Sequence, residues 1–178
     1  MAKITEIPKV KLFCAVIYQS HEKLSLALQK LTETYGEIDF IGKDFNFDKT
    51  DYYTPEMGDG LKRKLISFKN CIEPDDISDI KIFTNDLEIA LSENNKRTVN
   101  IDPGYLDYMK VILASAKYGP HKIYLKNGIY ADLTLIYSKG IFSDFQWTFP
   151  DFKTDLYRKE LLEMRNIYKK QIIKTTKD

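Results

Sequence analysis

Short apolar runs predict the strands of the first half of the chain. Residues 10–18 are apolar except for Lys11, and the brevity and β-branched content of this stretch favour a buried strand over a helix. Residues 37–41 predict a second strand, and residues 61–72, in which apolar and polar positions alternate, predict a third. A short fourth strand is expected at residues 98–101. The segment at 42–60 mixes acidic and aromatic residues and is expected to form a long loop, or a short strand followed by a loop.

Helical spacing and capping residues predict three helices. Ser20 is a good N-cap for a helix that runs to Tyr35, with Gly36 as its stop. A second helix is predicted from Pro74, which suits a first turn, to about residue 92. A third is expected to start at Thr154 and to carry a basic outer face. That face consists of Arg158, Lys159, Arg165, Lys169 and Lys170.

The stretch after the fourth strand predicts a further helix over residues 103–116. Asp102 is a good N-cap and Pro103 a good first helical residue. Gly119-Pro120 would end this helix. Its helical spacing is set by Tyr105, Leu106, Met109, Ile112, Leu113 and Ala116.

A hairpin is expected next, because Asn127-Gly128 stands between two alternating runs and a type I′ turn needs positive φ at both central residues. The expected partners are Lys126 with Ile129, Leu125 with Tyr130, Ile123 with Asp132, and His121 with Thr134. The side that carries the aliphatic positions of residues 129–137 is predicted to face the core. The other side brings His121, Asp132 and Thr134 within reach of one another.

The predicted order of elements is β-α-β-β-α-β, followed by α-β-β-α. The first six elements match the split β-α-β arrangement of ferredoxin-like folds. Because hairpins are mixed with helices, this order favours an α+β fold over a doubly wound parallel sheet. A chain of 178 residues without repeat, linker or low-complexity segment predicts one domain over residues 1–178.

Composition and charge narrow the classes of function. The formal net charge is +1 at pH 7, so no overall field points to nucleic acid or to a membrane surface. The longest apolar run, residues 12–18, is too short to span a bilayer. The first residues lack a basic-then-apolar signal pattern, and Cys14 and Cys71 lie in separate strand-like runs. We therefore expect a cytoplasmic protein with two buried thiols rather than a disulfide.

Sequence motifs for common cofactors are missing. The chain has neither G-x-x-x-x-G-K-[ST] nor G-x-G-x-x-G, so phosphate binding by those loops is unsupported. It has no H-E-x-x-H and no paired C-x-x-C, and no metal site is predicted. Residues 44–55 begin like a calcium loop, but Lys49 stands where glycine is needed and Pro55 where glutamate is needed. No cofactor can be named from the sequence.

His121 is the leading candidate for an acid/base. The chain has two histidines, and the predicted hairpin brings Asp132 and Thr134 beside His121, where the aspartate can orient the imidazole ring. Aspartate is depleted in strands, so its presence within a strand-like run favours a site. The structural alternative is a half-buried histidine that hydrogen-bonds its neighbours and stabilises the hairpin.

Cationic, amide, aromatic and acidic side chains are candidates for ligand binding. They are Arg97, Asn100, Lys117, Lys122, Tyr130, Asp51, Tyr52 and Tyr53. The three cations can form an anion pocket between strand, helix and hairpin, although solvated surface lysines are commoner. The two tyrosines of the long loop can stack on a base or sugar. The alternative is a loop that its buried rings anchor to the domain.

Short segments spread over nearly the whole chain carry a further likeness. They are Asp51-Tyr52-Tyr53, Glu56-Met57-Gly58, Leu61-Lys62-Arg63, Ser67-Phe68, residues 81–85, residues 99–105, residues 121–125, residues 128–132 and residues 147–151. On these segments the chain resembles an uncharacterised prokaryotic family, catalogued as a domain of unknown function (family number 4416). The resemblance implies a stand-alone domain of this size and implies no activity.

Two functions are compatible with these residues. The first is a ligand-binding or enzymatic domain for a phosphorylated or otherwise anionic small molecule, such as a nucleotide, with His121 as acid/base oriented by Asp132. The second is a non-catalytic module that docks protein or RNA through the aromatic stretch around Trp147 and the basic last helix. The net charge does not support nucleic acid as a partner. The sequence leaves the reaction and the oligomeric state open.

Overall fold

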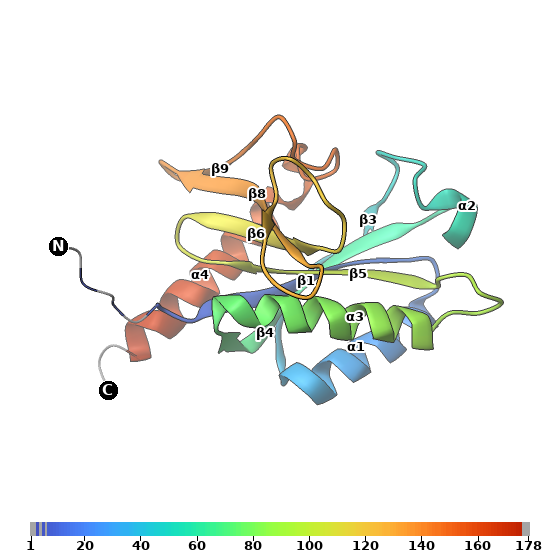
Figure 1. Cartoon of the computed structure of the whole chain (residues 1–178), viewed down its shortest axis with the longest axis horizontal. Helices are drawn as coiled ribbons and strands as arrows, with labels where there is room; N and C mark the ends of the chain where they lie inside the picture. The colour runs from blue at the N-terminus through green and yellow to red at the C-terminus, as the bar shows by residue number, and fades with distance from the viewer. Residues whose placement is uncertain (1–2, 4, 6, 176–178) are drawn as a thin grey trace.

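The computed structural model describes residues 3, 5 and 7–175. Within them, a nine-stranded antiparallel sheet has the order β2-β4-β1-β5-β6-β8-β7, with β3 on β4 and β9 on β8. The fold is therefore mixed α and β, as the sequence predicted (Figure 1). The strands are β1 (Val10–Tyr18), β2 (Ile38–Ile41), β3 (Phe45–Asn46), β4 (Lys62–Ile72), β5 (Val99–Leu106), β6 (Lys110–Ser115), β7 (Ile123–Tyr124), β8 (Tyr130–Ser138) and β9 (Ile141–Asp144). The helices are α1 (His21–Tyr35), α2 (Thr54–Met57), α3 (Ile77–Ala90) and α4 (Arg158–Thr175), with the 3-10 turns η1 (Pro74–Asp76) before α3 and η2 (Asp155–Tyr157) before α4.

Helices cover both faces of the sheet around β1, and every residue of β1 is buried. Leu12, Cys14 and Val16 point to the face that α1 and α3 cover (Figure 1). Phe13 and Ala15 point to the opposite face, where they pack against α4. A strand that is buried on both faces needs no polar alternation, which explains why Lys11 is the one charged residue of β1. The predicted buried strand is confirmed.

The capping residues start the helices where the sequence predicted. Ser20 accepts a hydrogen bond from the Lys23 backbone N–H at 3.5 Å, and α1 ends at Gly36. Thr154 accepts from the Leu156 N–H at 3.4 Å at the start of η2, which leads into α4. Three predicted helices are thus confirmed as α1, α3 and α4. No helix in the described part of the chain is long and apolar enough to cross a membrane.

The helix predicted over residues 103–116 is wrong, because this stretch forms β5, β6 and the tight turn between them. Asp102 caps no helix and lies within β5. The Asp107 carboxylate holds the turn, since its Oδ1 accepts from the N–H groups of Met109 and Lys110 at 2.7 and 2.9 Å. β5 is buried along most of its length. Its apolar residues therefore lack the alternation of a half-exposed strand and match helical spacing by chance.

The Asn127-Gly128 turn is confirmed, but the register of the hairpin differs from the prediction by one residue. Both turn residues have positive φ, +53° and +77°. The Leu125 N–H donates to the Ile129 carbonyl at 2.9 Å, which places an extra residue on the first strand. Ile123 consequently pairs with Ala131, one position from its predicted partner. A shift of one residue exchanges the faces of a strand, so the predicted pairs Leu125–Tyr130 and Ile123–Asp132 are wrong. Lys126 and Ile129 are partners as predicted, since the Ile129 N–H donates to the Lys126 carbonyl at 2.9 Å.

Candidate ligand-binding cleft

A cleft opens where β5 and β6 separate. The two strands pair only at residues 104–106 of β5 and 111–113 of β6. β5 extends further toward its N-terminal end along β1, unpaired with β6. Pro103, which has no N–H to donate, stands at the point of separation. The opening is lined by Asp102 on one side and by residues 113–117 on the other.

The cleft has two connected chambers, each of about 260 Å³. The aromatic chamber is lined by Phe47, Thr50, Tyr52, Tyr53, Arg63, Asp102, Leu113, Lys117, Phe149, Pro150 and Asp151. The polar chamber is lined by Tyr52, Tyr53, Lys81, Asn85, Glu88, Arg97, Asn100, Asp102, residues 113–117, Lys122 and Phe149. Together the chambers fall in the range of small-molecule sites, roughly 300–1,000 Å³.

The long loop of residues 42–60, which contains the short strand β3 and the one-turn helix α2, forms one wall of the cleft. The Phe47 N–H donates to the Leu61 carbonyl at 2.8 Å, which ties the loop to the start of β4. Tyr53 packs edge-on against Phe47 with ring centroids 5.8 Å apart, and Tyr52 packs against Tyr53 at 4.9 Å. The rings anchor the loop and also line the chambers, so the two interpretations of these tyrosines are compatible.

Arg63 of β4 forms the floor of the aromatic chamber. Its side chain is 4% exposed and pairs with Asp102 at 3.3 Å and with Asp151 at 2.8 Å. Its guanidinium lies 4.7 Å from the ring centroid of Phe47 and 5.6 Å from that of Phe152. One cation therefore joins β4, β5, the long loop and the segment that precedes α4.

Arg97 organises the polar chamber. Its guanidinium donates to both carboxylate oxygens of Glu56, at 2.6 and 2.8 Å. It also donates to Glu88 at 3.2 Å and to Asn100 at 2.8 Å. Glu88 is buried, which raises its pKa, and it accepts from the Ile101 N–H at 2.7 Å. These bonds connect α2, α3 and β5 around the chamber.

Replacing Glu56 by glutamine is expected to lower stability in only part of the pH range. Hydrogen bonds from Arg97 hold the pKa of Glu56 below its usual value of 4.5. The carboxylate therefore stabilises the fold fully above that value, and the stabilisation is lost as pH falls through the lower pKa of the folded state. The side chain is 36% exposed. We expect a loss of less than about 1 kcal/mol at pH 7 and none in strong acid.

Urea denaturation at neutral and acid pH measures this effect in Glu56→Gln. Glu163→Gln removes an exposed acid from α4 and serves as the control, with no expected change at either pH. A loss that is as large in acid as at pH 7 would show that the Glu56 carboxylate does not act through its charge.

Lys117 is the cation of the cleft without a carboxylate partner among the described residues. Its ammonium group donates to the Tyr52 hydroxyl and lies 4.2 Å from the centroid of the Tyr52 ring. Lys117 lines both chambers. Because its charge is not neutralised by an acid, it is available to an anionic ligand.

Asp132 connects the polar chamber to His121. The Lys122 ammonium lies 3.4 Å, and the His121 Nε2 3.6 Å, from the same carboxylate oxygen, Oδ2. The other oxygen, Oδ1, is buried without a hydrogen-bond partner in the described structure. Lys122 lines the polar chamber and donates to the Ser115 hydroxyl at 2.8 Å. His121 stacks on Trp147 with ring centroids 5.4 Å apart.

The structure brings part of the predicted site together. The candidates that line the cleft are Tyr52, Tyr53, Arg97, Asn100, Lys117 and Lys122. The candidates outside its lining are His121, Asp132, Thr134, Asp51 and Tyr130. Thr134 is fully buried and donates to the Asp132 carbonyl at 3.1 Å. Asp51 is exposed, and Tyr130 packs edge-on against Tyr124.

The sequence did not reveal the charged residues that α3 contributes. Lys81 and Glu88 stand about two turns apart with Asn85 between them, so they share one face of the helix. All three line the polar chamber. Lys81 donates to the Ile101 carbonyl at 2.9 Å and lies 3.6 Å from Asp102. Polar residues that recur along one face of this helix are the sequence pattern that could have indicated its contribution to the cleft.

These features define an antiparallel α+β protein with a cleft of aromatic and ion-paired walls. Among the described residues, no group of three or more His, Cys, Asp and Glu side chains is placed to hold a metal ion. The chain belongs to a family described as a domain of unknown function (DUF4416), whose family model matches residues 8–168. The resemblance is thus confirmed, and the whole cleft lies within the matched region. Comparison with curated proteins and with solved structures gave no match.

Proposed function

We propose that the cleft binds a small anionic molecule that carries a planar ring, with nucleotides as the leading class. The observation that carries this proposal is the junction of an aromatic and a polar chamber at Lys117, whose charge has no carboxylate partner among the described residues. A planar ring suits the first chamber, and an anionic group suits the lysine.

Aromatic side chains support the ring-binding half of the proposal. Tyr52 and Phe149 line the chamber and are 59% and 41% exposed, so part of their surface is open to a ligand. Pro150 adds a further flat apolar wall. A base that stacks on an aromatic side chain gains about 1–3 kcal/mol.

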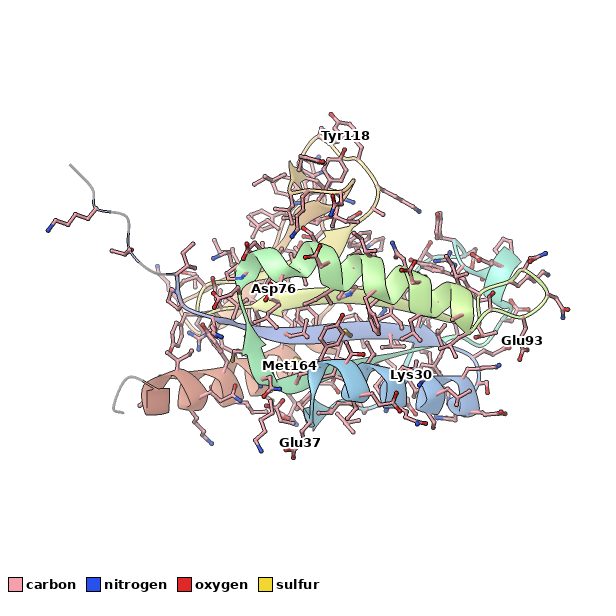
Figure 2. The ribbon with its side chains drawn as sticks, turned by 60° about the horizontal axis from the view of Figure 1, so that its bottom comes forward. Lys30, Glu37, Asp76, Glu93, Tyr118 and Met164 are labelled. Carbon is pink, nitrogen blue, oxygen red and sulfur yellow. The ribbon has the colours of Figure 1, made fainter. Side chains whose placement is uncertain are left out.

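Two lysines of the segment between β6 and β8 support the anion-binding half. Lys117 and Lys122 both line the polar chamber. The segment that carries them projects away from the sheet, and Figure 2 shows Tyr118 at its tip. Lys122 is oriented by Asp132, whereas Lys117 contacts the hydroxyl and the ring of Tyr52. Lysine binds phosphate groups as a point charge, which suits this arrangement.

A thermal-shift screen of the full chain with nucleotides, sugar phosphates and inorganic phosphate tests the proposal. A ligand at one hundred times its Kd stabilises the native state by about 2.7 kcal/mol. Lys117→Met is expected to remove this shift while changing the stability of the unliganded protein by less than about 0.5 kcal/mol, because the side chain is exposed.

The matched control is Lys126→Met, an exposed lysine of the same segment between β6 and β8 that pairs with Asp79 outside the cleft. This variant is expected to keep the full shift. Equal shifts in the two variants, or no shift of the wild type with any of these compounds, would overturn the proposal.

We extend this proposal from binding to catalysis, with His121 as the acid/base and Asp132 as the residue that orients it. The Nε2 to Oδ2 distance of 3.6 Å is longer than a hydrogen bond, so the ring would have to approach Asp132 for the carboxylate to orient it. The ring also stacks on Trp147 and lies outside the lining of both chambers. Binding is therefore better supported than catalysis. A His121→Gln variant that binds ligand normally but loses turnover would support the catalytic role, and unchanged turnover would contradict it.

Docking of protein or RNA through the aromatic stretch and the last helix has less support. The Trp147 indole N–H donates to the Leu133 carbonyl at 3.0 Å, and its ring stacks on Phe145. Arg158 of the basic face pairs with Asp144 at 3.0 Å. These side chains already have partners within the chain. If a folded Trp147→Ala variant lost the binding of a protein or RNA partner, that result would support this alternative.

We also propose that the first half of the chain has the split β-α-β arrangement of ferredoxin-like folds. In support, β4 lies between β1 and β2 and is antiparallel to both, so β1 and β2 run parallel and are joined by α1. β5 lies on the other side of β1, and α3 joins it to β4. Backbone NOEs between β1 and β4, without NOEs between β1 and β2, test this order.

A cytoplasmic location is proposed from the two cysteines. Cys14 and Cys71 are free thiols, the first fully buried and the second half-buried. Free thiols persist in reducing compartments. Fractionation of cells that express the chain tests this location, and recovery outside the cytoplasmic fraction would contradict it.

A further inference from the structure

The ion pairs of the cleft leave one lining cation without a carboxylate partner among the described residues. Arg63, Lys81, Arg97 and Lys122 each have a carboxylate at 3.6 Å or closer. Lys117 is the exception among the described residues that line the two chambers. A bound anion therefore gains most from Lys117, because the field of each other cation is largely cancelled by its own partner.

This charge balance fits a single phosphate group. A phosphate monoester carries about −1.5 to −2 charges near pH 7, and Lys117 offsets about one of them. Further phosphates would extend along the polar chamber toward Glu88 and Asp102. There they would meet carboxylates of the same sign, and like charges at short range repel.

Asp102 lies where the sugar of a bound nucleotide would pass. It lines both chambers, and its side chain remains 24% exposed. Its Oδ2 accepts from Asn100 at 3.0 Å and from Arg63 at 3.3 Å. An ionised carboxylate has about four lone-pair sites, so Asp102 can accept further hydrogen bonds from hydroxyl groups. Acidic side chains bind ribose hydroxyls in this way in dinucleotide-binding folds.

Resting on the function proposed above, we propose that the ligand is a ribonucleoside monophosphate. Its ring occupies the aromatic chamber, its sugar hydroxyls donate to Asp102, and its phosphate lies on Lys117. The base is not specified by this assignment, because the rings of Tyr52 and Phe149 stack on any base.

Isothermal titration of the wild type decides the ligand class. The four common ribonucleoside monophosphates are compared with their 2′-deoxy forms and, in buffer with Mg²⁺, with the triphosphates. We expect the best monophosphate to bind about tenfold more tightly than its deoxy form, the value of one hydrogen bond to a charged group. We expect a preference of about tenfold or more over the triphosphate, from the repulsion of adjacent carboxylates.

Each outcome of this titration is decisive. Equal or tighter binding of the triphosphate would overturn the single-phosphate assignment, and equal binding of the deoxy form would overturn the role of the sugar. Failure of every nucleotide to bind would instead overturn the proposed function itself. The two failures are therefore distinguishable.

Variants assign the contacts to residues. Lys117→Met is expected to bind a nucleoside and its monophosphate equally, whereas Lys126→Met keeps the wild-type preference for the monophosphate. Asp102→Asn is expected to lose most of the ribose preference, because the charged acceptor is replaced by a neutral amide. A folded Asp102→Asn protein with an unchanged preference would overturn the assignment to Asp102. Should this variant fail to fold, the wild-type titration still decides the ligand class.

Discussion

Replacing Gly104 by alanine is expected to destabilise the protein by about 3 kcal/mol. A Cβ atom at this position would meet the Ile112 carbonyl oxygen at 2.3 Å and side-chain atoms of Phe13 and Leu113 at 2.9 Å. The oxygen belongs to the backbone of β6, so it cannot move away without opening the β5–β6 ladder. In the helix that the sequence predicts here, the same substitution would stabilise by roughly 1 kcal/mol. The sign of the stability change thus distinguishes the observed strand pair from the predicted helix.

Chemical denaturation of Gly104→Ala gives this sign directly. Gly119→Ala is a suitable control, because its Cβ would meet only side-chain atoms of His121 and Lys122, at 3.2 and 3.3 Å. We expect that variant to change stability by less than about 1 kcal/mol. A Gly104→Ala protein at least as stable as the wild type would show that β5 and β6 do not approach so closely.

Arg63→Ala is expected to cost about 3–5 kcal/mol of unfolding free energy. The substitution leaves Asp151, whose side chain is 5% exposed, without its cation at 2.8 Å. Asp102 loses one of its partners at the same time. The rings of Phe47 and Phe152 also lose the group that they enclose. Against a total stability of about 5–15 kcal/mol, this loss lowers the melting temperature by many degrees.

The neighbouring residue provides the control for this prediction. Lys62 follows Leu61 at the start of the same strand and is only half-buried. Lys62→Ala is expected to change stability by about 0.5 kcal/mol or less. If Arg63→Ala cost no more than Lys62→Ala, the Arg63 pairs would not be desolvated, and the floor of the aromatic chamber would have no structural role.

Elements with local signals could be predicted from the sequence. The apolar character of β1 predicts a strand that is buried on both faces. Ser20 and Gly36 mark the ends of α1, because Ser20 accepts a hydrogen bond at its start and Gly36 adopts positive φ after its last residue. The stretch after Asp102-Pro103 could not be predicted, because its local start signal favours a helix. Pairing with β1, which is distant in sequence, outweighs that preference.

Several residues of the candidate site could be predicted from the sequence, but the contacts between them could not. Tyr52 and Lys117 were among the candidates because a tyrosine in a loop can stack on a ring and a lysine can bind an anion, although each also had a structural explanation. The pair of Arg63 with Asp151 could not be recognised, since it joins residues far apart in sequence that no local pattern relates. His121 lies near Asp132 as expected, although the register from which this was inferred is wrong.

The short ladder between β5 and β6 has a mechanical consequence. It divides the sheet into two leaves, one built on β1 and the other on β8, which meet at a hinge line beside Gly104. Local opening follows the lines of fewest contacts in a fold. A molecule that binds Asp102 on one leaf and Lys117 on the other connects the two leaves across the short β5–β6 ladder. Its binding free energy then adds to the free energy needed to separate the two leaves, so ligand binding is expected to make the sheet more rigid.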